Sequence, residues 1–478
     1  MASGRFTLIQ QNDIHAQLEP HPEHFWRGGA AEYRPTGGLA AAATVVRRIR
    51  AEAPECVLVD CGDAIHGTLP AMRTEGAAIV PALNALGVDL MTPGNWEYGF
   101  GPAVLRTRMA EMRSAVIACN VEDAADGSPL FEPYDVRELG GVRVGFIGVT
   151  SPIIPRMSPR FAAGLRFPDT RESLARSVER LRGRERVAVV VVVSHVGFAQ
   201  DVALARAIEG IDIILSGHTH NRLARPVRAG GAVLMQSGFS GSFLGRLDVS
   251  VQGGRVAEYA HALLELDSSV APDAAMQDVI DHALAPFREE MAEVVGETAT
   301  ALHRMGMLET TMDNLITDAY RDLAGTDVAF SHGWRFAPPV VPGPVTVADL
   351  WAMVPTNPRL FTARMTGREL TVMLEDNLQQ VLAGDAMQQA GGYIVRASGL
   401  SVVFRPNNGP GTRVEHVDVD GAPLDPEREY TVVGAGRRHL ADARDRQELE
   451  VTAIDALRRY LGNGRVAADL THRKFIPQ

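Results

Sequence analysis

Residues 213–220 read Ile213-Ile214-Leu215-Ser216-Gly217-His218-Thr219-His220, which predicts a buried β-strand that opens directly into a loop with two histidines. Solvated loops rarely need two imidazoles so close together, so this pattern indicates metal ligands. Four other short polar clusters occur earlier in the chain, and most of them also follow an apolar, β-branched run. They are Asn12-Asp13-Ile14-His15, Gly62-Asp63, Gly94-Asn95-Trp96-Glu97 and Ser194-His195. This arrangement is typical of an α/β domain, in which ligands gather outside the carboxyl ends of the strands.

The first 250 residues alternate apolar, strand-like runs with helical stretches. We expect buried strands at residues 5–9, 56–60, 116–120, 142–149, 187–193 and 211–215. We expect helices at residues 39–53, 77–86 and 170–182, with Gly183 as the stop of the last one.

The pattern changes after residue 270. Residues 272–300 read as one long amphipathic helix, and residues 301–478 begin with a helical stretch at 313–323 before turning to short mixed elements. We therefore expect one domain at residues 1–268, a helical connector at 269–300, and a second, α+β domain at 301–478.

Composition sets limits on the partners. The chain has 478 residues, of which 46% are hydrophobic and 22% charged, as in ordinary soluble globular proteins. Its net charge of −11 argues against nucleic acid or an anionic membrane as the main partner. An anionic substrate stays possible, because bound divalent ions reverse the local field. The simplest explanation of the acidity itself is solubility.

Cysteine usage and apolar runs bear on location. Cys56, Cys61 and Cys119 lack metal-type spacing and are expected to be buried free thiols. No secretory apolar segment precedes the first expected strand, and the longest apolar run, at residues 187–193, is too short to span a bilayer. The expected location is cytoplasmic, or periplasmic if the natural chain has been trimmed.

Seven side chains in the polar clusters are candidate metal ligands. Taken singly they have ordinary explanations, since Asp13 could cap a turn and His195 could be a core residue. Together they supply the hard and borderline donors that suit Mn, Zn or Fe ions, in about the number that two adjacent ions need when one carboxylate bridges them. The seven are Asp13, His15, Asp63, Asn95, His195, His218 and His220.

In this order the clusters resemble those of the calcineurin-like metallophosphoesterases, and more narrowly those of the two-domain 5′-nucleotidase family with its SoxB-type thiosulfohydrolase branch. The resemblance continues into the second half of the chain. Residues 311–319 are similar to that family's Asn-Leu-Ile-x-Asp-Ala helix, residues 330–335 are similar in character to its substrate-binding Asn-Gly-Gly-Ile-Arg loop, and residues 365–370 and 374–377 are similar to its Thr-Gly-x-x-Leu helix. Residues 333–335, 96–99 and 388–392 look most like the thiosulfohydrolase branch.

The resemblance implies a fold and a division of ligands. The fold is a four-layer αββα metallophosphoesterase sandwich with a C-terminal α+β domain of the 5′-nucleotidase type. Two divalent ions are expected, with manganese preferred and zinc, iron or cobalt as alternatives. In the implied assignment Asp13, His15 and His220 hold the first ion, Asn95, His195 and His218 hold the second, and Asp63 bridges them.

One departure concerns the catalytic machinery. The 5′-nucleotidases place a histidine directly after the asparagine ligand and an aspartate three residues beyond it, where this chain has Trp96 and Gly99. Candidates to replace this pair are His66, Arg335 and Arg156, in that order, although His66 could equally be a solvent-facing loop residue. Trp96 itself reads as a structural wall.

The resemblance also suggests a substrate-binding surface in the second domain. Trp334, Tyr393 and Phe404 could form a stacking slot for a base, and Arg335 lies in a loop suited to binding an anion. Packing in the core is an equally good reading of Phe404 and a weaker one of Tyr393.

The leading functional prediction is hydrolysis of phosphate esters of nucleotides or related small molecules by a metal-bridging hydroxide. A second is SoxB-like release of sulfate from a thiosulfonated carrier protein, which the lack of an export signal and the presence of Asn95, where that branch tends to have histidine, both disfavour. A third is a metal-containing, ligand-binding protein with little turnover. A small anionic substrate, and neither nucleic acid nor membrane, is the expected partner.

Overall fold

The computed structural model describes residues 2–389, 392–436, 440–441, 443–468, 470 and 474–478. The chain divides into two compact units. Unit 1 comprises residues 1–21 and 35–286, and unit 2 comprises residues 22–34 and 287–478. The chain therefore passes between the units at three places, because the hairpin of β2 (His21–Arg27) and β3 (Ala30–Thr36) belongs mostly to unit 2.

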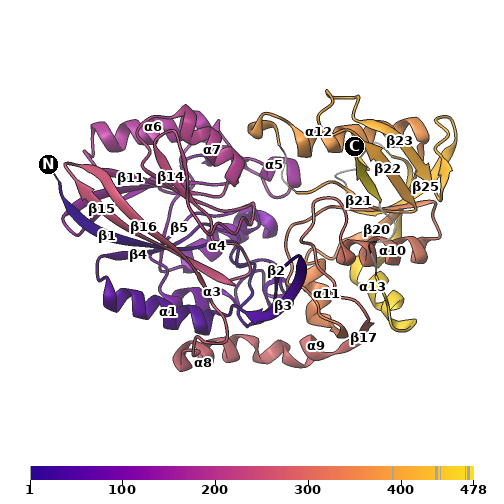
Figure 1. Ribbon diagram of the computed structural model, residues 1–478, viewed down its shortest axis with the longest axis horizontal. Helices are drawn as coiled ribbons and strands as arrows, with labels where there is room; N and C mark the ends of the chain where they lie inside the picture. The colour runs from indigo at the N-terminus through magenta and orange to yellow at the C-terminus, as the bar shows by residue number, and fades with distance from the viewer. Residues whose placement is uncertain (1, 390–391, 437–439, 442, 469, 471–473) are drawn as a thin grey trace. The chain divides into compact units, whose positions relative to one another are not determined.

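Unit 1 is built on two six-stranded sheets. The first has the order β16-β15-β1-β4-β5-β6, and the second has the order β13-β14-β12-β11-β9-β8 (Figure 1). In the first sheet the bounds are β1 Gly4–Gln11, β4 Cys56–Asp60, β5 Leu90–Met91, β6 Ala115–Val116, β15 Phe243–Gln252 and β16 Arg255–Glu265. In the second they are β8 Tyr134–Leu139, β9 Val142–Val149, β11 Val189–Ser194, β12 Ile213–Ser216, β13 Val227–Ala229 and β14 Ala232–Met235.

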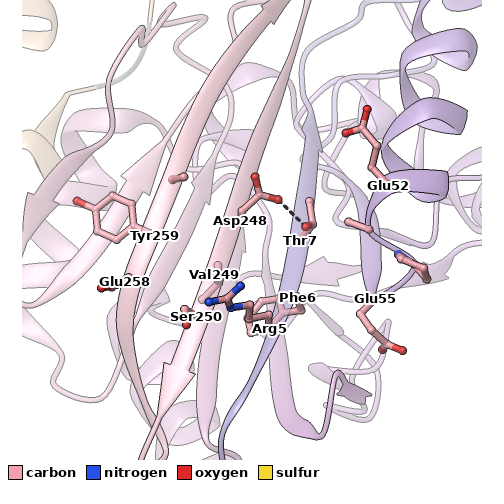
Figure 2. Close-up of a pocket in the computed structure, with 13 residues that line it drawn as sticks. Arg5, Phe6, Thr7, Glu52, Glu55, Asp248, Val249, Ser250, Glu258 and Tyr259 are labelled. Atoms are coloured by element: carbon pink, nitrogen blue, oxygen red, sulfur yellow. Dashed lines mark hydrogen bonds between the residues drawn. The ribbon is translucent and has the colours of Figure 1, made fainter.

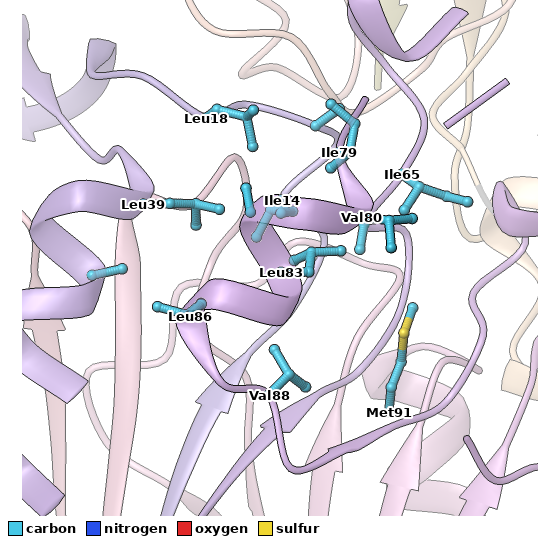
Figure 3. Packing of buried hydrophobic residues seen from close by; sticks show 14 of the residues in the cluster. Ile14, Leu18, Leu39, Ile65, Ile79, Val80, Leu83, Leu86, Val88 and Met91 are labelled. Carbon is cyan, nitrogen blue, oxygen red and sulfur yellow. The ribbon is translucent and has the colours of Figure 1, made fainter. Parts of the chain in front are cut away.

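Three hydrophobic clusters make unit 1 a four-layer αββα sandwich (Figure 1). Side chains alternate along β11, so Val191 faces the other sheet while Val190 and Val192 face the helices. The helices on that side include α6 (Thr170–Gly183) and α7 (Phe198–Ala207). On the opposite side, α1 (Leu39–Glu52) and α3 (Val80–Leu86) pack against the first sheet (Figure 3). The predicted α/β sandwich is confirmed.

The parallel strands of unit 1 decide where a site can form. β1, β4 and β5 run parallel in the first sheet, and β9, β11, β12 and β14 run parallel in the second. Their carboxyl ends therefore open into loops on one edge of each sheet, which is where ligands of such sheets bind.

Unit 2 is an α+β unit with a five-stranded sheet of order β21-β18-β25-β20-β26 and a four-stranded sheet of order β24-β23-β22-β27. The strands used below are β18 (Val328–Ser331), β21 (Arg396–Ser398) and β22 (Leu400–Phe404). Its helices include α10 (Thr311–Ala324), α12 (Gly367–Leu382) and α13 (Ala453–Gly462). The helix predicted at residues 313–323 corresponds to α10.

The prediction of one helix over residues 272–300 is wrong. The structure has α8 (Ala274–Leu284), a short α9 (Arg288–Ala292) and β17 (Val294–Thr298), which pairs with β19 (Gly343–Thr346). Pro286 lies at the break, where its missing N–H and its ring are incompatible with a helix interior. The strand expected at residues 116–120 is also shorter, since β6 ends at Val116. Among the described residues, no helix is both long and apolar enough to cross a membrane.

Candidate functional site

The predicted ligand residues lie on loops at the carboxyl ends of the strands in unit 1. Asp13 and His15 follow β1, Asp63 follows β4, and Asn95 follows β5. His195 follows β11, and His218 and His220 follow β12. Two compact groups result, in which one ligand atom of each residue lies within 4.8 Å of the others. The groups are Asp13, His15 and His220, and Asp63, His195 and His218.

Distances within the two groups are those of side chains that converge on a common point. Nε2 of His220 lies 3.1 Å from Nε2 of His15 and 3.2 Å from Oδ1 of Asp13. In the second group, Nε2 of His195 lies 3.1 Å from Oδ2 of Asp63. The same nitrogen is 3.8 Å from Oδ1 of Asp13, so the two groups adjoin each other.

Backbone conformation supports a functional interpretation of these loops. Five of the seven ligand residues adopt a positive φ, between 48° and 70°, which costs a non-glycine residue on the order of 1 kcal/mol. The five are Asp13, His15, Asp63, His218 and His220. The loops also support one another, because His15 N donates to Asp63 O and Asp13 N donates to Gly62 O, each at 2.9 Å. Strain held in this way is common at binding sites.

Two ligand atoms are buried without a hydrogen-bond partner. Within the described part of the chain, Oδ1 of Asn95 and Nε2 of His195 make no hydrogen bond. Leaving a buried polar atom unsatisfied costs roughly 1–3 kcal/mol. A divalent ion would use both atoms directly, so the residues present fit a metal centre.

The charge states of Asp13, Asp63 and His15 suit cations, whereas burial of His195 is outweighed by the facing carboxylates, which raise its pKa to about 10, so a metal ion there would displace a proton. Burial raises the pKa of Asp63, but the facing His195 outweighs it, and the pKa is lowered overall. Burial likewise raises the pKa of Asp13, which His220 and His195 lower well below its usual range. Burial lowers the pKa of His15 to about 4, so this imidazole is neutral at pH 7 and has a lone pair for a metal.

Glu97 ties two ligand loops together. Its buried carboxylate accepts the backbone N–H groups of Asp63 at 2.9 Å, Ala64 at 2.6 Å and Gly94 at 2.7 Å. The Asp63 loop and the Asn95 loop are therefore held by one side chain. Trp96 adds a further link, since its backbone N–H donates to Oδ1 of Asp63 at 2.7 Å.

Asp201 joins the two histidine loops, as Glu97 joins the loops of Asp63 and Asn95. Its buried carboxylate accepts the hydroxyls of Ser194 at 2.6 Å and Ser216 at 2.5 Å, the last residues of β11 and β12. Gln236 supports the second of these loops by donating to Gly217 O at 2.5 Å. Sequence reasoning missed Asp201 and Gln236, because no spacing connects them with the ligands.

His66 and Trp96 lie side by side in the interior. The His66 ring is 1% exposed and stacks on the Trp96 ring with centroids 4.3 Å apart and an interplanar angle of 17°. The alternative of a solvent-facing His66 is therefore wrong. Arg156, the weakest candidate for the catalytic cation, is an exposed residue of the short α5 (Ile154–Met157).

The predicted substrate-binding residues of unit 2 are only partly brought together. The Arg335 guanidinium lies 5.9 Å from the centroid of the Tyr393 ring, and Trp334 stacks on Phe336 at 5.4 Å. Phe404, in contrast, is 1% exposed and packs in the core of unit 2, with no ring face open to a ligand. The prediction of a stacking role for Phe404 is thus corrected to core packing. Ala390 and Gly391, part of the thiosulfohydrolase-like segment, lie outside the described residues.

Two buried arginines meet at Asp313 and lie beside the rings of Trp334 and Tyr393. Nε of Arg304 lies 3.0 Å from one carboxylate oxygen of Asp313, and Nε of Arg396 lies 2.9 Å from the other. Arg304 lies 5.8 Å from the centroid of Trp334, and Arg396 lies 5.5 Å from that of Tyr393. Arg304 and Arg396 were not predicted, since isolated arginines more than 90 positions apart give no pattern.

A surface pocket of about 510 Å³ lies away from the metal ligands (Figure 2). It is formed by the amino-terminal half of β1, by β15 and β16, and by the end of α1, and Thr7 donates to Asp248 there at 2.6 Å. None of the seven candidate ligands lines it.

Comparison with known proteins gives two family matches. Residues 6–222 match the calcineurin-like phosphoesterase family, and residues 293–445 match the 5′-nucleotidase C-terminal domain. The solved structure of the sulfate thiohydrolase SoxB from Thermus thermophilus has a TM-score of 0.93 and 26% identity, covering 99% of this chain and 97% of that one. A 5′-nucleotidase precursor, also from Thermus thermophilus, has a TM-score of 0.87 and 27% identity, covering 99% of both.

The curated relatives are 5′-nucleotidases and a nucleotide phosphoesterase. Human 5′-nucleotidase is 26% identical over 86% of this chain and 78% of its own length. The snake venom 5′-nucleotidase of Naja atra is 25% identical over 90% of this chain and 89% of its own length. The trifunctional nucleotide phosphoesterase YfkN of Bacillus subtilis is 24% identical over 87% of this chain, which spans only 30% of that protein.

Proposed function

This chain joins a calcineurin-like phosphoesterase domain to a 5′-nucleotidase C-terminal domain, and from that premise we propose that it hydrolyses the phosphate esters of nucleotides or related small anionic molecules. The observation that carries the proposal is the pair of adjoining ligand groups in unit 1. Seven hard or borderline donors, two of them otherwise unsatisfied, suit two divalent ions better than they suit a packed core.

In this proposal each ligand has a position. Asp13, His15 and His220, which form one group, would hold one ion. His195 and His218, from the second group, would hold the other together with Asn95. Asp63 lies between them. Manganese is the ion we favour for this mixture of oxygen and nitrogen donors, which also accepts zinc, iron or cobalt. When bound, the ions lower the pKa of a water molecule and neutralise the anionic oxygens of the substrate.

The remaining residues of unit 1 position the ligands. Glu97 fixes the backbone around Asp63 and Asn95 at once, so the bridging carboxylate and the amide ligand keep their relative placement. Asp201 fixes the ends of β11 and β12. Such outer partners commonly change metal affinity by about 10–100-fold.

Unit 2 carries candidate groups for binding a nucleotide or a similar anion. Trp334 and Tyr393 offer aromatic rings, which stack on nucleobases of any sequence, and Arg335 offers a guanidinium for an anionic group. The Arg304–Asp313–Arg396 network lies beside the two rings. Phe404 has no part in this surface.

The test is a substrate panel on protein reconstituted with Mn²⁺. It includes nucleoside monophosphates, nucleotide sugars, 2′,3′-cyclic nucleotides and an S-thiosulfonate peptide, with phosphate and sulfate release both measured. The proposal expects phosphate release that Asp63→Asn abolishes. If protein shown to contain two ions released no phosphate from any ester, the proposal would be overturned in favour of a ligand-binding protein.

A second candidate is hydrolysis of a thiosulfonate. It is favoured by the TM-score of 0.93 with the sulfate thiohydrolase SoxB and by the tryptophan that follows Asn95. Under this candidate a thiosulfonated carrier protein is the partner. Sulfate release without phosphate release in the same panel would select it.

A further inference from the structure

His66 has the attributes of a ligand-binding side chain rather than of a packed one. It is 1% exposed, and its Nδ1 is completely buried without a hydrogen bond to any residue that the structure describes. A neutral imidazole needs one donor and one acceptor partner, and each missing partner costs roughly 1–3 kcal/mol. Apolar residues of the same shape would fill this place at no such cost.

The ring is also held in one orientation. It stacks on Trp96 with centroids 4.3 Å apart, and Phe100 lies against it at 5.2 Å. On the remaining side is Gly99, where a Cβ atom would approach Cδ2 of His66 to 3.3 Å and Nε2 to 3.5 Å. His66 therefore occupies the space that a side chain at position 99 would need.

Through Trp96 the imidazole is connected to the metal ligands. The backbone N–H of Trp96 holds Oδ1 of Asp63, while its ring holds His66. Burial, together with the nearby His15, lowers the pKa of His66 to about 3, so the ring is neutral at pH 7. A neutral ring has one N–H group to donate.

We propose that His66 donates a hydrogen bond to an oxygen of the reacting anionic group, and that Trp96 and Gly99 are present because this imidazole takes the space beside them. The inference rests on the proposed function for the identity of the anion, phosphate or a phosphate ester. A preorganised donor of this kind acts on the charge that develops in the transition state, where removal of one donor typically costs about 100–1000-fold in kcat.

The experiment compares His66→Phe with His66→Gln in the full chain loaded with Mn²⁺. Phenylalanine keeps an aromatic ring to stack on Trp96 but has no N–H, whereas glutamine restores a donor without the ring. We expect His66→Phe to bind two ions, to have an equal or higher Tm, to lose about 100-fold in kcat, and to show about 10-fold weaker binding both of substrate, measured as KM, and of inorganic phosphate, measured by calorimetry. His66→Gln is expected to recover part of both losses.

Two readouts separate this inference from the proposed function. A His66→Phe variant with the wild-type rate and the wild-type affinity for inorganic phosphate would show that His66 only packs, and would overturn the inference. If the wild-type protein released no phosphate from any ester, the proposed function would fail, but the affinity for inorganic phosphate would still decide the role of His66. Loss of bound metal from His66→Phe would also overturn the inference, since the residue would then serve the ligands.

Discussion

In unit 1 the candidate ligands lie on strand-end loops that buried carboxylates join in pairs, whereas in unit 2 two buried arginines meet at one aspartate and lie beside aromatic rings. Glu97 and Asp201 each join two loops of unit 1 through short hydrogen bonds. In unit 2, both arginines form ion pairs with Asp313. Under the proposed function, the first arrangement fixes atoms that would share a small ion, and the second lies beside rings that would bind a larger and flatter group.

This difference predicts separate effects on activity. Changes in unit 1 should alter metal content and kcat, because a shift of a few tenths of an ångström disturbs coordination. Changes in unit 2 should alter KM, because ring stacking contributes to binding in the ground state and the transition state alike. Four substitutions test whether the two regions behave in this way.

The largest expected effect is that of Asp63→Asn. The variant loses the charge shared between the two ligand groups, so we expect about one bound ion in place of two and a fall in kcat of about 1000-fold or more. Metal analysis and phosphate release measure the two quantities. The control is Asp212→Asn, a partly buried aspartate just before β12, which lies in neither ligand group and should keep both ions. Equal losses in both variants would contradict a special role of Asp63.

A smaller effect is expected from Glu97→Gln. The amide keeps the shape of the carboxylate but turns an N–H₂ group toward backbone donors, so some of the N–H groups of Asp63, Ala64 and Gly94 lose their acceptor. We expect metal affinity to fall by about 10–100-fold and the free energy of unfolding by about 2 kcal/mol. Titration with Mn²⁺ and urea unfolding check these values. Unchanged metal affinity would mean that the loops hold their geometry without Glu97.

Trp334→Ala tests the other region. Stacking of a base on an aromatic side chain contributes on the order of 1–3 kcal/mol, so KM for nucleotides should rise about 10-fold while kcat and metal content stay near the wild-type values. The small substrate p-nitrophenyl phosphate serves as a control, because it lacks the base and should show little change. A fall in kcat without a change in KM would contradict the expectation that substitutions in unit 2 alter KM and not kcat.

The smallest effect concerns pH. Burial raises the pKa of Asp201 to about 7, whereas an aspartate in the unfolded chain releases its proton near pH 4. The folded protein therefore holds the extra proton in this window, and the free energy of unfolding falls as pH rises from about 4 to about 7. Asp201→Asn cannot ionise and should remove a slope of up to about 1 kcal/mol per pH unit. Urea unfolding at pH 5, 6 and 7 measures it, and equal slopes in both proteins would contradict the shift.

The difference between the two units also explains which of their residues could be predicted from the sequence. Each ligand of unit 1 follows a strand by a few residues, so an apolar run marks its place, and the expected strands at residues 56–60 and 142–149 coincide with β4 and β9. Arg304 and Arg396 meet at Asp313 only after folding, and nothing in their surroundings in the sequence distinguishes them from surface arginines.

Two errors had signals that could have been used. In Leu400-Ser401-Val402-Val403-Phe404 the apolar side chains at positions 400, 402 and 404 alternate toward the core, which already favours packing for Phe404. Pro286 stands in the middle of the expected helix at residues 272–300, where it predicts a break. The buried position of His66 had no such signal, because it depends on a ring from another loop, that of Trp96. Asp201 had none either, because the two serines that it joins end different strands.

The most direct test of the dinuclear centre is the number of divalent ions bound per chain. Protein reconstituted with Mn²⁺ and passed through a desalting column would be analysed by mass spectrometry of the metal, with His220→Ala beside the wild type. Two ions in the wild type and about one in the variant are the predicted result, since His220 belongs to a single ligand group. Fewer than one ion in the wild type, or the same number in both proteins, would contradict the assignment of these residues as a two-metal centre.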